Sequence, residues 1–393
     1  MARAMLRWPC MRSLGVAALL ALAGVLAACA SMDASSAFRG GDNEPGAGSA
    51  ADAGGFANGD STAGSPELAP TDNGVIMVHA AGMSAFRLCF ENELDRRPQP
   101  DAQVMPDANV VGVEVGSAVR IAPLKGPPGK IWVFEEPLIR EISGKGQTCK
   151  QLLGNQVGNY AHELPPVTTD LSKGVHLLVV AGCVAKTPLR SYTNAECGED
   201  YDETKGNLRI VERELKGANR AGDALPTQVL HLSQPLESAR GAGTLSVSFG
   251  DVKTTSSTHT SIASAPKLFG APLDLTSSPA FEGSNEGVYA EVGFRVSLKD
   301  GANPPTVVAQ QSLADVQRLS APAEIPTTYY AAASNYVLLL LGDPNAKGED
   351  GGVSDDPLQK VHLLAVPVIE PKADAGADAE APIDGGSAPD GGT

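Results

Sequence analysis

Two acidic loops carry the side chains of this sequence that are best suited to holding a metal ion. The first spans residues 197–203 and the second spans residues 343–356. Carboxylate and amide oxygens are the ligands that Ca²⁺ prefers, and Asp343 and Asn345 have the spacing with which an EF-hand loop begins. The second loop then places Ser354 where such a loop needs a bidentate acid. We therefore predict solvated acidic hairpins and no metal ligands, with Ca²⁺ binding by these loops as the alternative.

Nucleophilic catalysis has one candidate motif. Ser264-Ala265-Pro266-Lys267 fits the pattern Ser-x-x-Lys. The motif needs a helix, and Pro266 argues against one at this place. The sequence contains no Gly-x-Ser-x-Gly, and no Gly-rich phosphate loop follows an apolar strand. We therefore predict no catalytic residue and no cofactor-binding residue.

Two histidines occupy similar places near the ends of apolar runs. His79 follows Val75-Ile76-Met77-Val78, and His231 follows Val229-Leu230. A ring at the end of a buried strand commonly bonds to a neighbouring loop, so we predict a structural role for both. The remaining histidines show no His-x-x-x-His or metal-triad spacing; they are His162, His176, His259 and His362.

The cysteines indicate an oxidising compartment. Beyond Cys10 and Cys29 the chain holds four more, namely Cys89, Cys149, Cys183 and Cys197. Two disulfides are the simplest use of four exported thiols, with three possible connectivities. Zinc is the competing interpretation, but there is no Cys-x-x-Cys pair and no histidine at ligand spacing.

Among these connectivities we predict Cys183 with Cys197 and Cys89 with Cys149. Cys183 ends the strongest apolar strand of the first half, and Cys197 lies in the loop that follows it. Closing such a short loop restricts the unfolded chain by about 3 kcal/mol. Cys89 then takes Cys149 by elimination.

The N-terminus has the features of an export signal. A basic start precedes an uncharged apolar run over residues 14–28, which ends in Leu26-Ala27-Ala28-Cys29. This arrangement resembles a bacterial lipoprotein signal, which implies cleavage after residue 28 and acyl chains on Cys29. A transmembrane anchor is the alternative, but the run is shorter than the ~20 residues that a spanning helix needs. Ala30, rather than Asp, follows the cysteine, which suggests the outer membrane by analogy with well-studied sorting.

The charge balance excludes one class of partner. The chain has a net charge of -16, and residues 1–28 contain three arginines and no acid, so removing them makes the mature chain more negative still. Binding to nucleic acid requires a clustered basic surface, which this balance does not favour. We therefore expect no nucleic-acid partner, and contact with a membrane only through the acyl chains on Cys29.

Low-complexity segments flank the central part of the chain. Residues 30–72 are rich in Gly, Ala, Ser and Asp, and residues 372–393 form an Asp/Ala/Gly/Pro tail. Neither shows hydrophobic periodicity, so we predict a disordered tether over 29–72 and a disordered acidic tail over 372–393.

The central part alternates in the manner of β-strands and is duplicated. Apolar runs bounded by Gly and Pro recur through 73–216 and again, in the same order, through 224–371. The offset between matching runs is about 150–160 residues, which indicates a duplicated domain rather than a short-period solenoid. We predict an all-β protein of two tandem β-sandwich domains over these ranges, the second able to fold alone.

The strands of the first half also resemble a known family. Val75-Ile76-Met77-Val78-His79-Ala80, the alternating strand from Phe86 to Glu91 and the strand from His176 to Gly182 are similar to the family catalogued as domain of unknown function 4397. The chain lacks that family's Pro-Asp-Ala-Pro link and inserts a segment from Glu136 to Asp170. The resemblance implies an exported immunoglobulin-like β-sandwich and no chemistry.

These observations together predict a lipid-anchored protein of the bacterial envelope. We expect a non-catalytic binding or structural module, with an envelope protein or a polysaccharide as its partner. The alternatives are a hydrolase of envelope polymers and a carbohydrate-binding module. The latter needs exposed aromatic rings, and we expect Trp132 to lie in the core and Tyr329 and Tyr330 at the surface.

Overall fold

The structure is a computed structural model, and it describes residues 73–101, 112–142, 146–154, 160–187, 190–216, 226–253, 259–270, 276–277, 290–299, 301, 304–318, 335–347 and 352–368. All of these residues belong to one compact unit, Gly59–Thr393. Cys29, the predicted signal and tether, Tyr329, Tyr330 and the predicted tail lie outside the described residues. Strands dominate the described part, so the predicted all-β class is confirmed.

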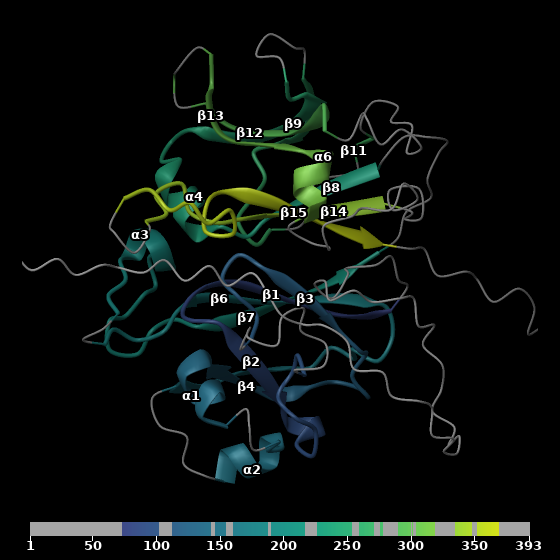
Figure 1. Ribbon diagram of the computed structural model, residues 1–393, viewed down its shortest axis with the longest axis vertical. Helices are drawn as coiled ribbons and strands as arrows, with labels where there is room; N and C mark the ends of the chain where they lie inside the picture. Colours follow the sequence, from purple (N-terminus) through teal and green to yellow (C-terminus); the bar gives the residue numbers. More distant parts are fainter. Residues whose placement is uncertain are drawn as a thin grey trace, which may run out of the picture. The chain divides into compact units, whose positions relative to one another are not determined.

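The first half forms two sheets (Figure 1). One has the strand order β3-β1-β6-β7 and the other the order β2-β4-β5. Their elements are β1 (Gly74–Gly82), β2 (Phe86–Phe90), η1 (Glu91–Glu93), β3 (Ala118–Ile121), β4 (Gly129–Glu135), α1 (Glu136–Ile142), α2 (Cys149–Gly154), β5 (Ala161–Val167), β6 (Val175–Cys183), α3 (Asn194–Cys197) and β7 (Arg209–Leu215).

The second half repeats this pattern of pairing. Its sheets have the orders β11-β8-β14-β15 and β10-β9-β12-β13. Their elements are β8 (Pro226–His231), α4 (Gln234–Ala239), β9 (Thr244–Asp251), β10 (Thr260–Ser264), β11 (Thr276–Ser277), β12 (Val292–Lys299), β13 (Thr306–Ser312), α6 (Leu313–Arg318), β14 (Asn335–Leu341) and β15 (His362–Val368).

The two halves match in register as well as in order. β1 runs parallel to β6 with His79 opposite Val180, and β8 runs parallel to β14 with His231 opposite Leu340. β7 and β15 then pair antiparallel with the outer side of β6 and β14. The order of apolar runs that the sequence repeats is therefore repeated in the strand pairing.

Three hydrophobic clusters arrange the four sheets as successive layers. One cluster lies between the two sheets of the first half, and another between the two sheets of the second half. The third joins the sheet of β1 and β6 to the sheet of β8 and β14 (Figure 1). The two halves therefore share a buried face, which the prediction of tandem domains did not include.

Strands in the two middle layers are buried on both faces. Along β14, Leu338 and Leu340 belong to the second half's own cluster, whereas Val337 and Leu339 belong to the shared cluster. Successive side chains of a strand point to opposite faces, so a strand with apolar neighbours on both sides needs a continuous apolar run. This explains why β6 and β14 read as unbroken apolar segments.

Some elements differ from those predicted. The segment from Glu136 to Asp170, which the resemblance marks as an insertion, contains α1, α2 and the strand β5. β5 includes Pro165 and Pro166 and pairs only with β4 among the described strands, as expected of an edge strand that tolerates proline. Trp132, expected in the core, is half-buried and packs on a small cluster around Cys89 and Cys149.

The four described cysteines form the two predicted pairs. Cys89 is bonded to Cys149 with 5.6 Å between their Cα atoms, and Cys183 is bonded to Cys197 with 5.4 Å between theirs. The first pair ties α2 to β2, and the second ties α3 to the end of β6. Because all four side chains are buried, both bonds belong to the packed interior.

Candidate functional site

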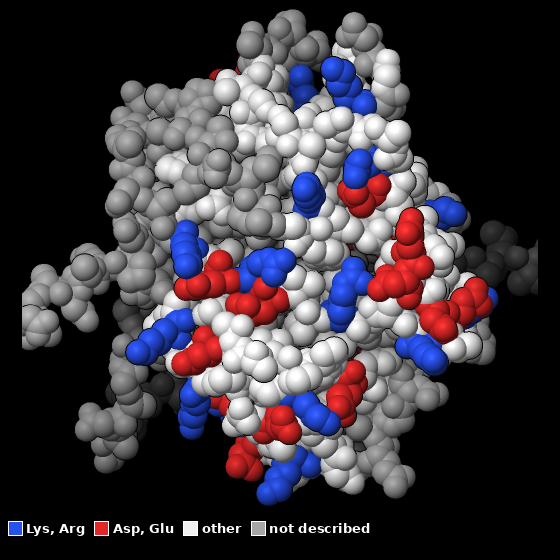
Figure 2. All heavy atoms as spheres, turned by 180° about the vertical axis from the view of Figure 1, so that it is seen from behind, with Lys and Arg blue, Asp and Glu red and all other residues white. Residues whose placement is uncertain are grey.

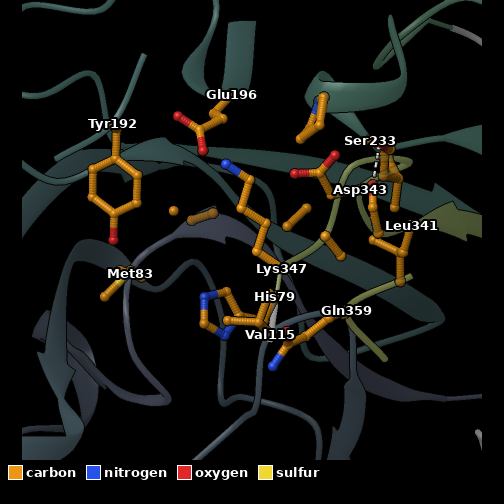
Figure 3. A pocket seen from close by; sticks show the side chains of 18 residues that line it. His79, Met83, Val115, Tyr192, Glu196, Ser233, Leu341, Asp343, Lys347 and Gln359 are labelled. Atoms are coloured by element: carbon orange, nitrogen blue, oxygen red, sulfur yellow. Dashed lines mark hydrogen bonds between the residues drawn. The ribbon is translucent and has the colours of Figure 1, made fainter. Parts of the chain in front are cut away.

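A pocket of about 280 Å³ lies where the parallel strand pairs of the two halves end (Figure 3). Its apolar wall includes Ala81, Met83, Val115, Leu232, Leu341 and Ala346. Its polar side chains are those of His79, Tyr192, Glu196, Ser233, Asp343, Lys347 and Gln359. Both halves therefore contribute to one site.

The topology explains this position. Parallel strands have their carboxyl ends at the same edge of a sheet, so β1 and β6 end together, and β8 and β14 end together. The shared cluster stacks these two sheets. The loops that leave the strands carry the lining side chains, which is where ligand sites of layered sheets usually form.

Two equivalent glycines turn the chain at this edge. Gly182 has a φ of 81° and Gly342 a φ of 87°. A Cβ at these positions would lie 2.3 Å from the carbonyl oxygen of Asn207 and 1.9 Å from that of Lys360. Only glycine combines this backbone conformation with so close an approach of the next segment. The sequence therefore encodes both of these positive-φ positions as glycine.

His79 is fully buried at the base of the pocket. Its Nδ1 donates to the carbonyl oxygen of Val113 at 2.9 Å, and its Nε2 has no hydrogen-bond partner. Burial lowers the pKa of His79 to about 4, so the ring is neutral near pH 7. Since Nδ1 carries the proton, Nε2 presents an unused acceptor.

His231, the equivalent residue, is held differently. Its Nε2 donates to Glu237 on α4 at 3.2 Å, and burial lowers its pKa to about 4. Both histidines thus bond to a group outside their own strand, as the predicted structural role requires. Only His79 lines the pocket.

Two carboxylates face the pocket from opposite halves (Figure 3). Glu196 on α3 accepts from the backbone N–H and hydroxyl of Thr193 at 2.7 and 2.8 Å. Asp343 follows Gly342 and accepts from the backbone N–H of Asn345 at 2.7 Å. Burial raises the pKa of the Asp343 carboxyl, and the charge of Glu196 also acts to raise it.

Lys347 is the cation of this site. In Figure 3 its side chain rises between Asp343 and Glu196, with the ammonium group on the side of Glu196. Its charge acts to lower the pKa of Asp343, against the effects of burial and Glu196. The side chain is otherwise exposed to solvent. Two carboxylates and one ammonium group therefore lie at one side of a largely apolar pocket.

The acidic loops are engaged in their own turns. In the first loop, Asp202 accepts from the backbone N–H groups of Thr204 and Lys205 at 2.7 and 3.1 Å. In the second, Asp356 accepts from the backbone N–H of Leu358 at 2.9 Å. No group of three potential metal-ligating side chains occurs among the residues that the structure describes. Glu349 and Asp350 lie outside them.

The Ser-x-x-Lys motif lies on no helix. Ser264 ends β10, and Ala265 has a φ of 52° in the loop that follows. The hydroxyl of Ser264 lies 3.1 Å from that of Ser261. Pro266 predicted this absence of a helix correctly, so the helical spacing that the motif needs is absent here.

Glu135 is a charged site that the sequence analysis missed. The side chain is fully buried at the end of β4, and it accepts from His162 Nε2 and Ser84 Oγ, both at 2.8 Å, and from both terminal nitrogens of Arg190. Burial by itself would raise the pKa of this carboxyl, but these donors more than offset that effect and lower it to about 2.

This cluster fixes the loop that borders the pocket. Arg190 precedes Tyr192 by two residues, and Tyr192 is part of the pocket wall. The guanidinium group also lies 5.9 Å from the centre of the Tyr160 ring. The cluster joins residues 84, 135, 162 and 190, which lie far apart in the sequence, so no local spacing indicates it. An acid at the end of the apolar run Ile131-Trp132-Val133-Phe134 was the one available signal.

Comparison with known protein families, curated proteins and solved structures finds no match to this chain. Within the described ranges, no helix has the length and apolar character needed to cross a membrane.

Proposed function

We propose that this chain is a non-catalytic binding module anchored to the bacterial envelope by lipid on Cys29, built from two immunoglobulin-like sandwiches related to the domain of unknown function 4397. The observation that carries the binding role is the pocket of about 280 Å³ to which both halves contribute. An envelope component is the expected partner, because the leader ending in Leu-Ala-Ala-Cys directs export.

The protonation states of the buried groups support a role without catalysis. General acid–base chemistry works best with a group whose pKa lies near the working pH. The pKa of Glu135 is lowered to about 2 and that of His79 to about 4, so neither exchanges a proton readily near pH 7. An envelope-polymer hydrolase would need one carboxyl with a raised pKa as its acid beside a second, ionised carboxylate, and neither Glu135 nor His79 can supply that acid.

Surface charge agrees with the expected partners. On the face shown in Figure 2, Lys and Arg side chains are interspersed with Asp and Glu over the described residues. The described part of that face shows no continuous basic patch of the kind that nucleic acid requires. Two disulfides among the described cysteines also agree with an oxidising compartment.

The anchor is tested by replacing Cys29 in cells grown with a labelled fatty acid. Two or more acyl chains hold a protein at a membrane stably. We expect the wild type to incorporate label and to partition into the detergent phase, whereas Cys29→Ala should remain unprocessed and unlabelled. Cys10→Ala, in the same leader but without the Leu-Ala-Ala context, is the matched control. An unlabelled wild type in the aqueous phase would refute the anchor.

A further inference from the structure

The pocket combines a small apolar cavity with an excess of negative charge at one side. Ligand pockets commonly measure about 300–1,000 Å³, so a cavity of about 280 Å³ suits a compact ligand. Met83, Leu232 and Leu341 supply apolar surface from both halves. The occupant should therefore have a short apolar body.

The charged side chains of the pocket favour a ligand with a positive charge. Asp343 and Glu196 face the cavity, and Lys347 is the one ammonium group among the described residues that line it. With both acids ionised, the three side chains carry a formal net charge of -1 at this side of the pocket, where Glu196 and Lys347 are exposed and Asp343 is half-buried. Asp343 is also partly desolvated, and a desolvated carboxylate gains more from a cation than an exposed one does.

A buried acceptor provides an independent indication of a ligand. His79 lines the pocket, is fully buried, and leaves Nε2 without a partner. Buried polar atoms nearly always have a hydrogen-bond partner, so an orphaned acceptor beside a cavity calls for an explanation. A donor carried by the ligand would satisfy this nitrogen, which is closed to solvent in the structure.

We propose that the pocket binds a small primary ammonium ion with an apolar body of about four carbons. The ammonium group takes the position of the Lys347 amine between Asp343 and Glu196, and the carbon chain lies on the apolar wall. Lys347 thus acts as a built-in competitor for the same carboxylates. The inference rests on the proposed binding role and names the chemical class of the ligand.

The first test compares three probes with the same carbon chain. Equilibrium dialysis of the purified full chain measures the binding of n-butylamine, butan-1-ol and butanoate at pH 7. We expect butylamine to bind at least tenfold more tightly than the alcohol, and butanoate to bind more weakly than both. Equal binding of amine and alcohol, or no binding of the amine at millimolar concentration, would overturn the proposal.

Two variants then test whether the amine binds in this pocket. Asp343→Asn and Glu196→Gln keep the oxygens that accept from Asn345 and Thr193, so the local turns are preserved. We expect each to weaken butylamine binding at least fivefold. Asp355→Asn makes the same charge change in the same loop, on an acid that is fully exposed and lies 3.6 Å from Lys360, and should leave binding unchanged. Equal effects of all three would show non-specific attraction and refute the site.

A variant of Lys347 distinguishes a simple amine ligand from an amino acid, which carries a carboxylate as well as an ammonium group. Lys347→Met keeps the length of the side chain and removes the competing charge. We expect it to strengthen butylamine binding at least threefold. An amino-acid ligand would instead need Lys347 for its carboxylate, so weaker amine binding in this variant, or tighter binding of 2-aminopentanoate than of butylamine by the wild type, would overturn the proposal. None of these outcomes bears on the lipid anchor, whose failure is seen separately.

Discussion

Leu339→Ala tests whether the two halves unfold as one structure. Leu339 is fully buried on β14 and belongs to the cluster that both halves share. Truncating a buried leucine to alanine costs about 2–5 kcal/mol, because contacts are lost and a cavity remains. Domains have a free energy of unfolding of only about 5–15 kcal/mol. The change should therefore be large enough to detect in both halves.

Hydrogen exchange followed by mass spectrometry provides the assay. A loss of 2 kcal/mol corresponds to an increase of about 30-fold in the population of open molecules. We expect amides of β6, in the first half, to exchange faster by about this factor in Leu339→Ala. Val307→Ala, at an exposed side chain of the edge strand β13, should have little effect.

A neighbouring residue separates coupled unfolding from local contact loss. Leu338 is buried on the opposite face of β14, in the cluster between the two sheets of the second half alone. If the halves unfold together, Leu338→Ala also accelerates exchange in β6. Exchange of β6 that responds to neither variant would refute the reasoning.

The rival view is the independent folding that the sequence predicts for residues 224–371. That segment contains no cysteine, so its melting should not depend on reductant. Expressed alone it would expose Val337, Leu339 and Val366, and burial of such a side chain contributes about 1.5–3 kcal/mol. A monomeric segment with a cooperative melt would support the rival view.

Three further predictions concern single features of the fold. Gly342→Ala should lower the melting temperature more than Gly301→Ala, because both glycines have a positive φ but only Gly342 lies against a carbonyl oxygen; equal losses in thermal scans would contradict this. The free energy of unfolding, measured in urea, should fall from pH 4.5 toward pH 2, because Glu135 takes up a proton at a higher pH in the unfolded state than in the folded state. Glu135→Gln should reduce this dependence on pH. An unchanged dependence in the variant would show that Glu135 is not its cause. Non-reducing peptide mapping should recover Cys183 linked to Cys197, worth about 3 kcal/mol; a peptide joining Cys89 to Cys183 would contradict both pairs.

The sequence predicted those parts of the fold that depend on local pattern. Continuous apolar runs identified β1, β6 and β14, and the order of runs identified the duplication. The pairing of Cys183 with Cys197 followed from a short loop at the end of β6. In each case neighbouring residues carry the signal, so one chain read from end to end is sufficient.

Long-range features could not be predicted in the same way. The shared face brings Val78 and Leu339 into one cluster, although they are far apart in the sequence. An apolar run gives no information on which sheet covers its second face. The Glu135 cluster likewise draws Ser84, His162 and Arg190 from three separate segments. β5 was missed because its two prolines argue against a strand unless its position at an edge is known.

The pocket shows how duplication can lead to a site that neither copy holds alone. The residue after the turn glycine is Cys183 in the first half and Asp343 in the second. Cys183 is bonded to Cys197, which fixes the short helix α3 and with it Glu196. Asp343 has no such bond and faces the pocket directly. The position after the glycine therefore has a different role in each half. In the first half, its disulfide holds the helix that carries Glu196; in the second half, the position is Asp343 itself. Both halves are therefore needed to form the charged side of the pocket.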